Sequence, residues 1–180
     1  MVYILLGEGF EEIEAVAPCD VLRRGGVSVR FAAVGTQKAV PGSHGITLVA
    51  DTLVSEISPK KDDMLVIPGG MGGVRSIKAD KEVMDLLVKA AKEGVSLAAI
   101  CAGPSVLAAL GLTDGKRITC FPGCKSLMGS AVCQTQYPTV TDDRLITGRS
   151  AGSAIDFGLE LLKFIKGEDA SKTIRTEIIY

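Results

Sequence analysis

Short apolar runs that alternate with helix-forming segments constrain the fold of this chain more than any other feature. The first run, residues 2–6, is continuously apolar, which is typical of a strand in a parallel sheet covered on both faces. Comparable runs predict further strands at residues 27–34, 46–50, 64–67, 96–100, 117–120 and 144–147. Helical periodicity predicts helices at residues 11–24, 80–93, 103–110 and 154–166. This order predicts one α/β domain, residues 1–180, with a doubly wound, mainly parallel sheet sandwiched by helices.

The first predicted helix combines an acidic first turn with an apolar stripe. Five apolar side chains share one predicted face, which we expect to lie against the core: Ile13, Val16, Ala17, Val21 and Leu22. Glu11, Glu12 and Glu14 stand where the helix dipole favours negative charge, so the pattern alone favours a solvated acidic turn. The alternative is that the Glu14 carboxylate reaches a thiol at a neighbouring strand end.

Composition excludes several classes of function. Lys and Arg number 20 against 21 Asp and Glu, so the chain offers no basic surface for nucleic acid or an anionic membrane. No apolar run approaches the roughly 18 residues of a membrane span. A single histidine excludes sites that need two, and an odd number of cysteines, five, with no signal peptide predicts the reducing cytoplasm.

The most specific candidate residue is Cys101, at the sharp join between a predicted strand and the following helix. Small residues stand two positions before and after it, Ala99 and Gly103, as a nucleophile on a strained turn requires. A place at the start of a helix is expected to lower the thiol pKa and favour the thiolate. The alternative is a small buried apolar residue.

A second glycine-rich turn, Pro68-Gly69-Gly70, follows the strand predicted at residues 64–67. Its backbone amides are candidates for an oxyanion hole together with the amide of Ala102. The alternative is a tight turn that needs a positive φ. The sequence contains no phosphate-binding or dinucleotide-binding glycine motif.

Three cysteines and the histidine remain to be assigned. Cys120, Cys124 and Cys133 lack a fourth metal ligand nearby, and His44 is far away in the sequence, so we predict no metal site. We interpret His44, in a predicted turn or hairpin, as polar surface rather than as a catalyst.

Five motifs together resemble the DJ-one/ThiJ/PfpI family, specifically the branch that contains the parkinsonism-associated protein deglycase and its bacterial relatives. In family order they are GFEEIE (9–14), DVLRRGG (20–26), VIPGG (66–70), AICAGP (99–104) and TGR (147–149). The resemblance covers essentially the whole chain. It implies a flavodoxin-like fold, no cofactor and a homodimer.

The resemblance also implies roles for individual residues. Cys101 would be the reactive, oxidisable cysteine, and Glu14 a protonated carboxyl that donates a hydrogen bond to the thiolate and, after oxidation, to the sulfinate. Gly70 and Ala102 would supply backbone amides. Substrate-binding or interface roles would fall to Arg24, which matches a dimer-interface arginine, to His44, where relatives often carry an arginine, and to Arg149.

Two departures from the family pattern bear on function. Peptidase-type and amidotransferase-type relatives pair the cysteine with a histidine, whereas the residue after Cys101 is Ala102. Some deglycase-branch members have a histidine before a proline, where this chain has Phe121-Pro122. A mechanism that depends on either histidine is therefore not expected.

These observations lead to three functional hypotheses. The first is an enzyme, a cofactor-independent glyoxalase or protein deglycase that uses Cys101 against dicarbonyls or their glycated adducts. The second is a non-enzymatic redox sensor or chaperone in which Cys101 is oxidised. Amide or peptide hydrolysis, or a role in thiamine metabolism, ranks last because no base stands beside the nucleophile.

Overall fold

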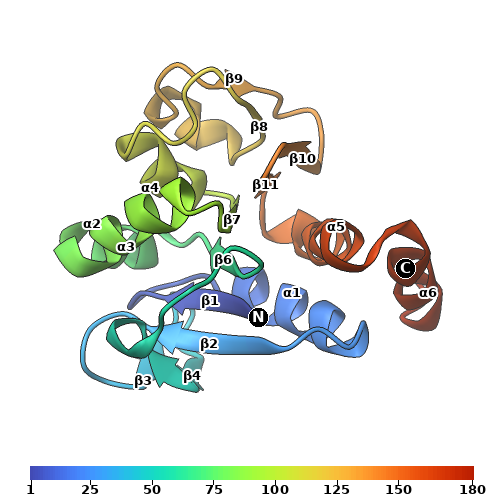
Figure 1. Ribbon diagram of the computed structural model, residues 1–180, viewed down its shortest axis with the longest axis horizontal. Coiled ribbons are helices and arrows are strands. Elements are labelled where there is room, and N and C mark those ends of the chain that lie inside the picture. The colour runs from blue at the N-terminus through green and yellow to red at the C-terminus, as the bar shows by residue number, and fades with distance from the viewer.

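The computed structural model, which describes residues 1–180, is built on a seven-stranded sheet (Figure 1). The strand order is β10-β11-β7-β6-β1-β2-β5, and only the β10–β11 pair is antiparallel. The strands are β1 (Val2–Leu6), β2 (Val29–Ala33), β5 (Thr52–Leu53), β6 (Met64–Ile67), β7 (Ser96–Ile100), β10 (Thr139–Asp142) and β11 (Leu145–Gly148). The predicted mainly parallel sheet is confirmed.

Helices cover both faces of this sheet, which explains why its central strands are continuously apolar (Figure 1). One face carries α1 (Glu12–Arg24), α5 (Ala154–Lys166) and α6 (Glu168–Glu177). The other carries α2 (Met71–Ala79), α3 (Lys81–Lys92) and α4 (Pro104–Ala109). None of these helices has the length and apolar character needed to cross a membrane.

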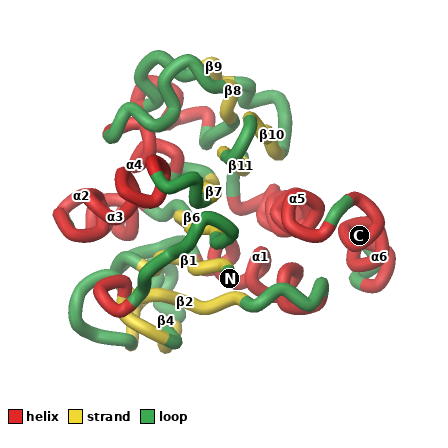
Figure 2. The backbone as a smooth tube through the Cα atoms, viewed as in Figure 1, coloured by secondary structure: helices red, strands yellow, loops and turns green.

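Two small strand pairs lie outside the main sheet. An antiparallel hairpin joins β3 (Ala39–Pro41) to β4 (Thr47–Val49), and a parallel pair joins β8 (Arg117–Ile118) to β9 (Val132–Cys133). Figure 2 shows that the chain around β8 and β9 is mostly loop. Three short 3-10 helices complete the fold: η1 (Val54–Glu56), η2 (Pro122–Leu127) and η3 (Ala151–Ser153).

Helix α2, which was not predicted, begins within a glycine-rich segment that the sequence indicated as a break. Glycine weakens helices by about 1 kcal/mol relative to alanine, so the pattern disfavoured a helix. Tight packing accounts for the glycines. A Cβ on Gly72 would lie 2.9 Å from Cα of Gly9, and one on Gly73 would lie 2.8 Å from Cα of Phe10. Helix α6 and strands β5, β9 and β10 were also not predicted.

The predicted orientation of α1 is wrong at its N-terminal end. Ile13 and Val16 are 55% and 41% exposed, whereas Glu12 and Glu14 are buried. The helix packs on the core through Ala15 and residues further along, while its first turn is enclosed by other segments. The interpretation of a solvated acidic turn therefore fails for Glu12 and Glu14.

Candidate functional site

Cys101 occupies a strained turn immediately after β7, as the sequence predicted. Its φ is +64°, in the left-handed region that residues with a side chain rarely adopt. Two backbone hydrogen bonds hold it there: its N–H donates to the carbonyl of Gly148 at 2.9 Å, and its carbonyl accepts from the N–H of Phe121 at 2.9 Å. The side chain is half-buried, so the thiol is held in a fixed place with some access to solvent.

The turn also depends on the missing side chain of Gly103. A Cβ there would lie 2.5 Å from the carbonyl oxygen of Ile67 and 2.9 Å from that of Ile100. The end of β6 and the turn after β7 therefore meet too closely for any other residue. This contact brings the Pro68-Gly69-Gly70 turn beside Cys101.

Glu14 projects from α1 into this junction and is fully buried. Its Oε2 accepts a hydrogen bond of 2.7 Å from the N–H of Gly69, while Oε1 has no hydrogen-bond partner. A Cβ on Gly69 would lie 2.4 Å from this Oε2 and 2.9 Å from Cβ of Cys101, so the carboxyl and the cysteine flank the same glycine. The structure thus brings together Glu14 and Cys101, which the resemblance paired.

The two side chains affect each other's protonation. Burial raises the pKa of Glu14 to about 7, against the opposing effects of Cys101 and of the Gly69 amide. Burial and the neighbouring Glu14 carboxylate raise the pKa of the Cys101 thiol, and the Ala102 amide only partly offsets them. The predicted lowering of the thiol pKa is therefore wrong, because burial and the Glu14 carboxylate both disfavour the thiolate. The pair favours a single negative charge, so a Cys101 thiolate requires the proton to be on Glu14.

Backbone amides surround the pair, but they are not equivalent. Neither Gly70 nor Ala102 donates its N–H to a backbone carbonyl, so both remain candidate oxyanion donors. Gly70 has a φ of +83°, and a Cβ there would lie 2.5 Å from the carbonyl oxygen of Gly9. The N–H of Gly69 is directed at Glu14, so Gly69 positions the carboxyl rather than an oxyanion.

Glu12, two residues before Glu14 in α1, anchors the β3–β4 hairpin. Its carboxylate accepts hydrogen bonds from the backbone N–H of His44 at 2.6 Å and from Ser43 Oγ at 3.2 Å, and it pairs with His44 Nδ1 at 2.9 Å. Burial opposes ionisation, yet these bonds lower the pKa of Glu12 to about 2. Glu12 also raises the pKa of His44. Polar atoms of Glu11, Glu12 and His44 lie within 4.8 Å of one another, but their bonds to the hairpin and to the α1 N-terminus explain the cluster without a metal.

Neither Arg24 nor Arg149 forms a hydrogen bond with Cys101. Arg24 is exposed and its Nε donates to Asp20 at 2.7 Å on the outer side of α1. Arg149 follows β11, where its N–H donates to the carbonyl of Pro138 at 2.9 Å. Their predicted roles in substrate binding or at an interface therefore remain predictions.

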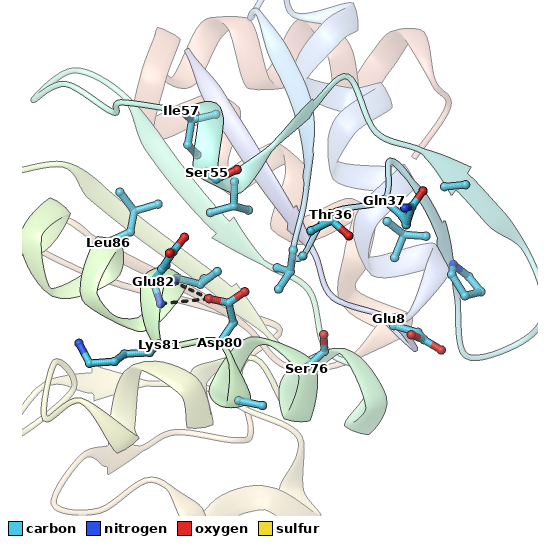
Figure 3. Close-up of a pocket in the computed structure, with 18 residues that line it drawn as sticks. Glu8, Thr36, Gln37, Ser55, Ile57, Ser76, Asp80, Lys81, Glu82 and Leu86 are labelled. Carbon is cyan, nitrogen blue, oxygen red and sulfur yellow. Dashed lines mark hydrogen bonds between the residues drawn. The ribbon is translucent and has the colours of Figure 1, made fainter.

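A cavity of about 960 Å³ lies away from Cys101 (Figure 3). It is enclosed by the loop after β2, by η1 and by the junction of α2 and α3, and none of its lining residues belongs to the Cys101 site. Asp80, near its centre in Figure 3, accepts hydrogen bonds from the N–H groups of Glu82 and Val83 and so caps α3. The cavity therefore contributes no group to the Cys101–Glu14 pair.

Comparison with known proteins identifies the family. Residues 1–164 match the DJ-1/PfpI family, and the chain belongs to it. The crystal structure of Drosophila melanogaster DJ-1beta superposes with a TM-score of 0.93 at 32% identity, covering 99% of this chain and 96% of that one.

Relatives with functional names are similarly distant in sequence. The glutathione-independent glyoxalase of Caenorhabditis elegans is 32% identical over 95% of this chain and 91% of its own length. A deglycase of Pyrococcus abyssi is 30% identical over 92% of this chain and 99% of its own length. Protein DJ-1 homolog A of Arabidopsis thaliana is 35% identical over 99% of this chain, which spans only 46% of that protein.

Proposed function

We propose that this protein is a cysteine-dependent, cofactor-independent glyoxalase or deglycase that acts on small dicarbonyls or their glycated adducts. The observation that carries the proposal is the buried Glu14 carboxyl beside Cys101, with one oxygen held by Gly69 and the other without a partner. A proton on the unpartnered Oε1 can be donated to a thiolate or to a bound substrate oxygen. The names of the nematode and archaeal relatives support this class of substrate.

The reaction starts when the Cys101 thiolate adds to the aldehyde carbon and forms a C–S bond. Negative charge then develops on the carbonyl oxygen, where the N–H groups of Gly70 and Ala102 are available to stabilise it. Glu14 protonates that oxygen and then, as a carboxylate, carries the C–H proton of the same carbon to the neighbouring carbonyl carbon. The hydroxyl proton passes to the neighbouring oxygen, which leaves a 2-hydroxy thioester on Cys101. Addition of water breaks the C–S bond and releases a 2-hydroxy acid. The net change is dicarbonyl plus water to hydroxy acid.

The test is the consumption of methylglyoxal by the purified protein. We expect Cys101→Ser and Glu14→Gln each to lower kcat/KM by about 100-fold or more, because one removes the nucleophile and the other the proton carrier. Cys133→Ser, which alters another half-buried cysteine, is the matched control and should retain wild-type turnover. Undiminished turnover in Cys101→Ser would refute the mechanism.

Redox sensing is the second candidate, because the same site also suits oxidation. The thiol of Cys101 is half-buried rather than inaccessible, and a protonated Glu14 is placed to stabilise a sulfinate. Mild peroxide followed by peptide mass spectrometry should then add two oxygens at Cys101 in the wild type and fewer in Glu14→Gln. A chaperone activity that survives Cys101→Ser would separate that role from this site.

We also propose that the chain forms a homodimer through the outer side of α1. Ile13 and Val16 expose apolar surface there, and Arg24 lies further along the same helix. Sedimentation should report a dimer for the wild type and a shift toward monomer for Ile13→Asp. A monomeric wild type at micromolar concentration would contradict the proposal.

A further inference from the structure

The cysteines divide between the two faces of the sheet, and four of the five have no part in the proposed chemistry. Cys19 and Cys101 pack with the core beneath α1 and α5. Cys120, Cys124 and Cys133 pack with the core on the opposite face. The second group therefore forms a separate cluster of thiols.

Strand register places two of these thiols together. In the parallel pair β8–β9, Ile118 lies opposite Cys133, and the N–H of Gln134 donates to the carbonyl of Ile118 at 2.8 Å. Cys120 follows Ile118 by two residues, and in extended chain such positions share one side. The intervening Thr119 donates through its N–H to Thr147 Oγ1 at 2.8 Å, on the side of β11. Cys120 accordingly turns into the core against which Cys133 packs.

The two thiols differ in exposure in a way that suits a two-step oxidation. Cys120 is fully buried, whereas Cys133 is half-buried and open to a small oxidant. Burial, followed by the interaction with Cys133, raises the pKa of Cys120 to about 12. Cys133 is thus the thiol that meets the oxidant first, and Cys120 is the one held beside it.

We propose that Cys120 and Cys133 form a second oxidisable site, a dithiol that peroxide converts to a disulfide. The sulfur of Cys133 attacks hydrogen peroxide, so that an S–O bond forms, the O–O bond breaks and water leaves. The sulfur of Cys120 then attacks the sulfenic acid, so that the S–S bond forms and the S–O bond breaks. The thiol proton of Cys120 leaves with the hydroxide as a second water. Two thiols and one peroxide give one disulfide and two waters.

The surrounding structure permits this closure and connects it to the nucleophile. Strands β8 and β9 have only two residues each, lie outside the main sheet and are flanked by loops (Figure 2). Closure requires the two sulfur atoms to approach to the roughly 2.05 Å of a disulfide. Phe121, the residue after Cys120, donates its N–H to the carbonyl of Cys101 at 2.9 Å. The dithiol therefore lies one residue from a hydrogen bond that holds the Cys101 turn.

The test is peroxide treatment of the Cys101→Ser variant, which isolates this site from the proposed active site. After alkylation of free thiols and digestion with trypsin without reductant, Cys120 and Cys124 lie in peptide 118–125 and Cys133 in peptide 126–144. We expect these two peptides to be recovered joined by a disulfide. They should come from denatured protein that has the size of a single chain, so that the bond lies within one chain. The link should persist when Cys124→Ser is added to Cys101→Ser. It should disappear when Cys133→Ser is added instead.

Other outcomes would overturn the proposal. A disulfide internal to peptide 118–125 would pair Cys120 with Cys124 instead. Loss of the joined peptides in the Cys124→Ser variant would assign the bond to Cys124 and Cys133. Full alkylation of all three thiols after oxidation would show that the site does not react. The joined peptides are sought first in protein that retains these three cysteines, so their recovery does not depend on the stability of the variants.

Discussion

The two buried glutamates at the start of α1 share a helix turn but have opposite electrostatic surroundings. Glu12 faces the β3–β4 hairpin, where hydrogen bonds from the backbone and side chains of Ser43 and His44 stabilise its charge. Glu14 faces the end of the sheet, where Gly69 supplies a single donor and Cys101 is the neighbour. Their pKa values consequently move apart, to about 2 for Glu12 and about 7 for Glu14.

Burial disfavours the charged form of both carboxyls, and the direction of each net pKa shift depends on how far hydrogen bonds offset it. The number of donors decides it, because a well-supplied carboxylate remains ionised whereas a poorly supplied one retains its proton. The hairpin carboxylate is therefore a structural anchor, and the carboxyl beside Cys101 is available for proton transfer.

The largest effect is expected from Gly69→Ala. The new methyl group would lie 2.4 Å from Glu14 Oε2 and 2.9 Å from Cβ of Cys101, so the pair must separate. We expect a loss of about 3 kcal/mol in the free energy of unfolding and loss of any dicarbonyl turnover. Gly152→Ala is the control, since its nearest contact, Ser150 Oγ, is 3.9 Å away. Equal stability of the two variants in urea would show that the junction is not close-packed.

Glu14→Gln should alter the dependence of stability on pH. The folded-state pKa of Glu14 is raised from 4.5 to about 7, so folding retains a proton that the unfolded chain releases. This proton contributes on the order of 3 kcal/mol to the free energy of unfolding. The contribution is complete below pH 4.5 and is lost as the pH rises to about 7. Urea denaturation across this range should show the decline in the wild type and its absence in Glu14→Gln. An unchanged decline would assign it to another group.

Glu12→Gln should have the opposite signature. The folded-state pKa of Glu12 is lowered from 4.5 to about 2, so its stabilisation is present above pH 4.5 and lost as the pH falls through about 2. At pH 6 we expect the free energy of unfolding of the variant to be about 2 kcal/mol lower than that of the wild type. The reason is that the hairpin donors then bond to a neutral amide instead of a charged carboxylate. Urea denaturation should show a smaller difference in the free energy of unfolding between variant and wild type at pH 3 than at pH 6. A constant difference would contradict the charge argument.

The smallest effect concerns His44, whose pKa is raised above its usual value of 6.5 by Glu12. Because the chain has one histidine, its imidazole signals in an NMR titration need no assignment. The midpoint should lie above 6.5 in the wild type and move back toward it in Glu12→Gln, with Glu14→Gln as the matched control. A midpoint that responds equally to both variants would mean that the two carboxyl sites are not independent.

Local patterns were sufficient to predict the framework of the fold and the position of the nucleophile. Continuous apolar strands occur where both faces of a sheet are covered, and β1, β6 and β7 follow that rule. Small residues on both sides of Cys101 predicted a turn that the structure confirms with a positive φ. The glycines of α2, in contrast, are explained by contacts with residues about 60 positions earlier, which no local pattern reports.

The sequence by itself determined the α/β class, the mainly parallel sheet and the elbow at Cys101, because each depends on residues adjacent along the chain. Only the tertiary structure decided which glutamate is held as a charged anchor and which retains its proton. The reason is physical: the donors that set these two pKa values come from Ser43, His44 and Gly69, which are distant in sequence from α1. The same is true of the thiols of Cys120 and Cys133, which only the pairing of β8 with β9 brings together.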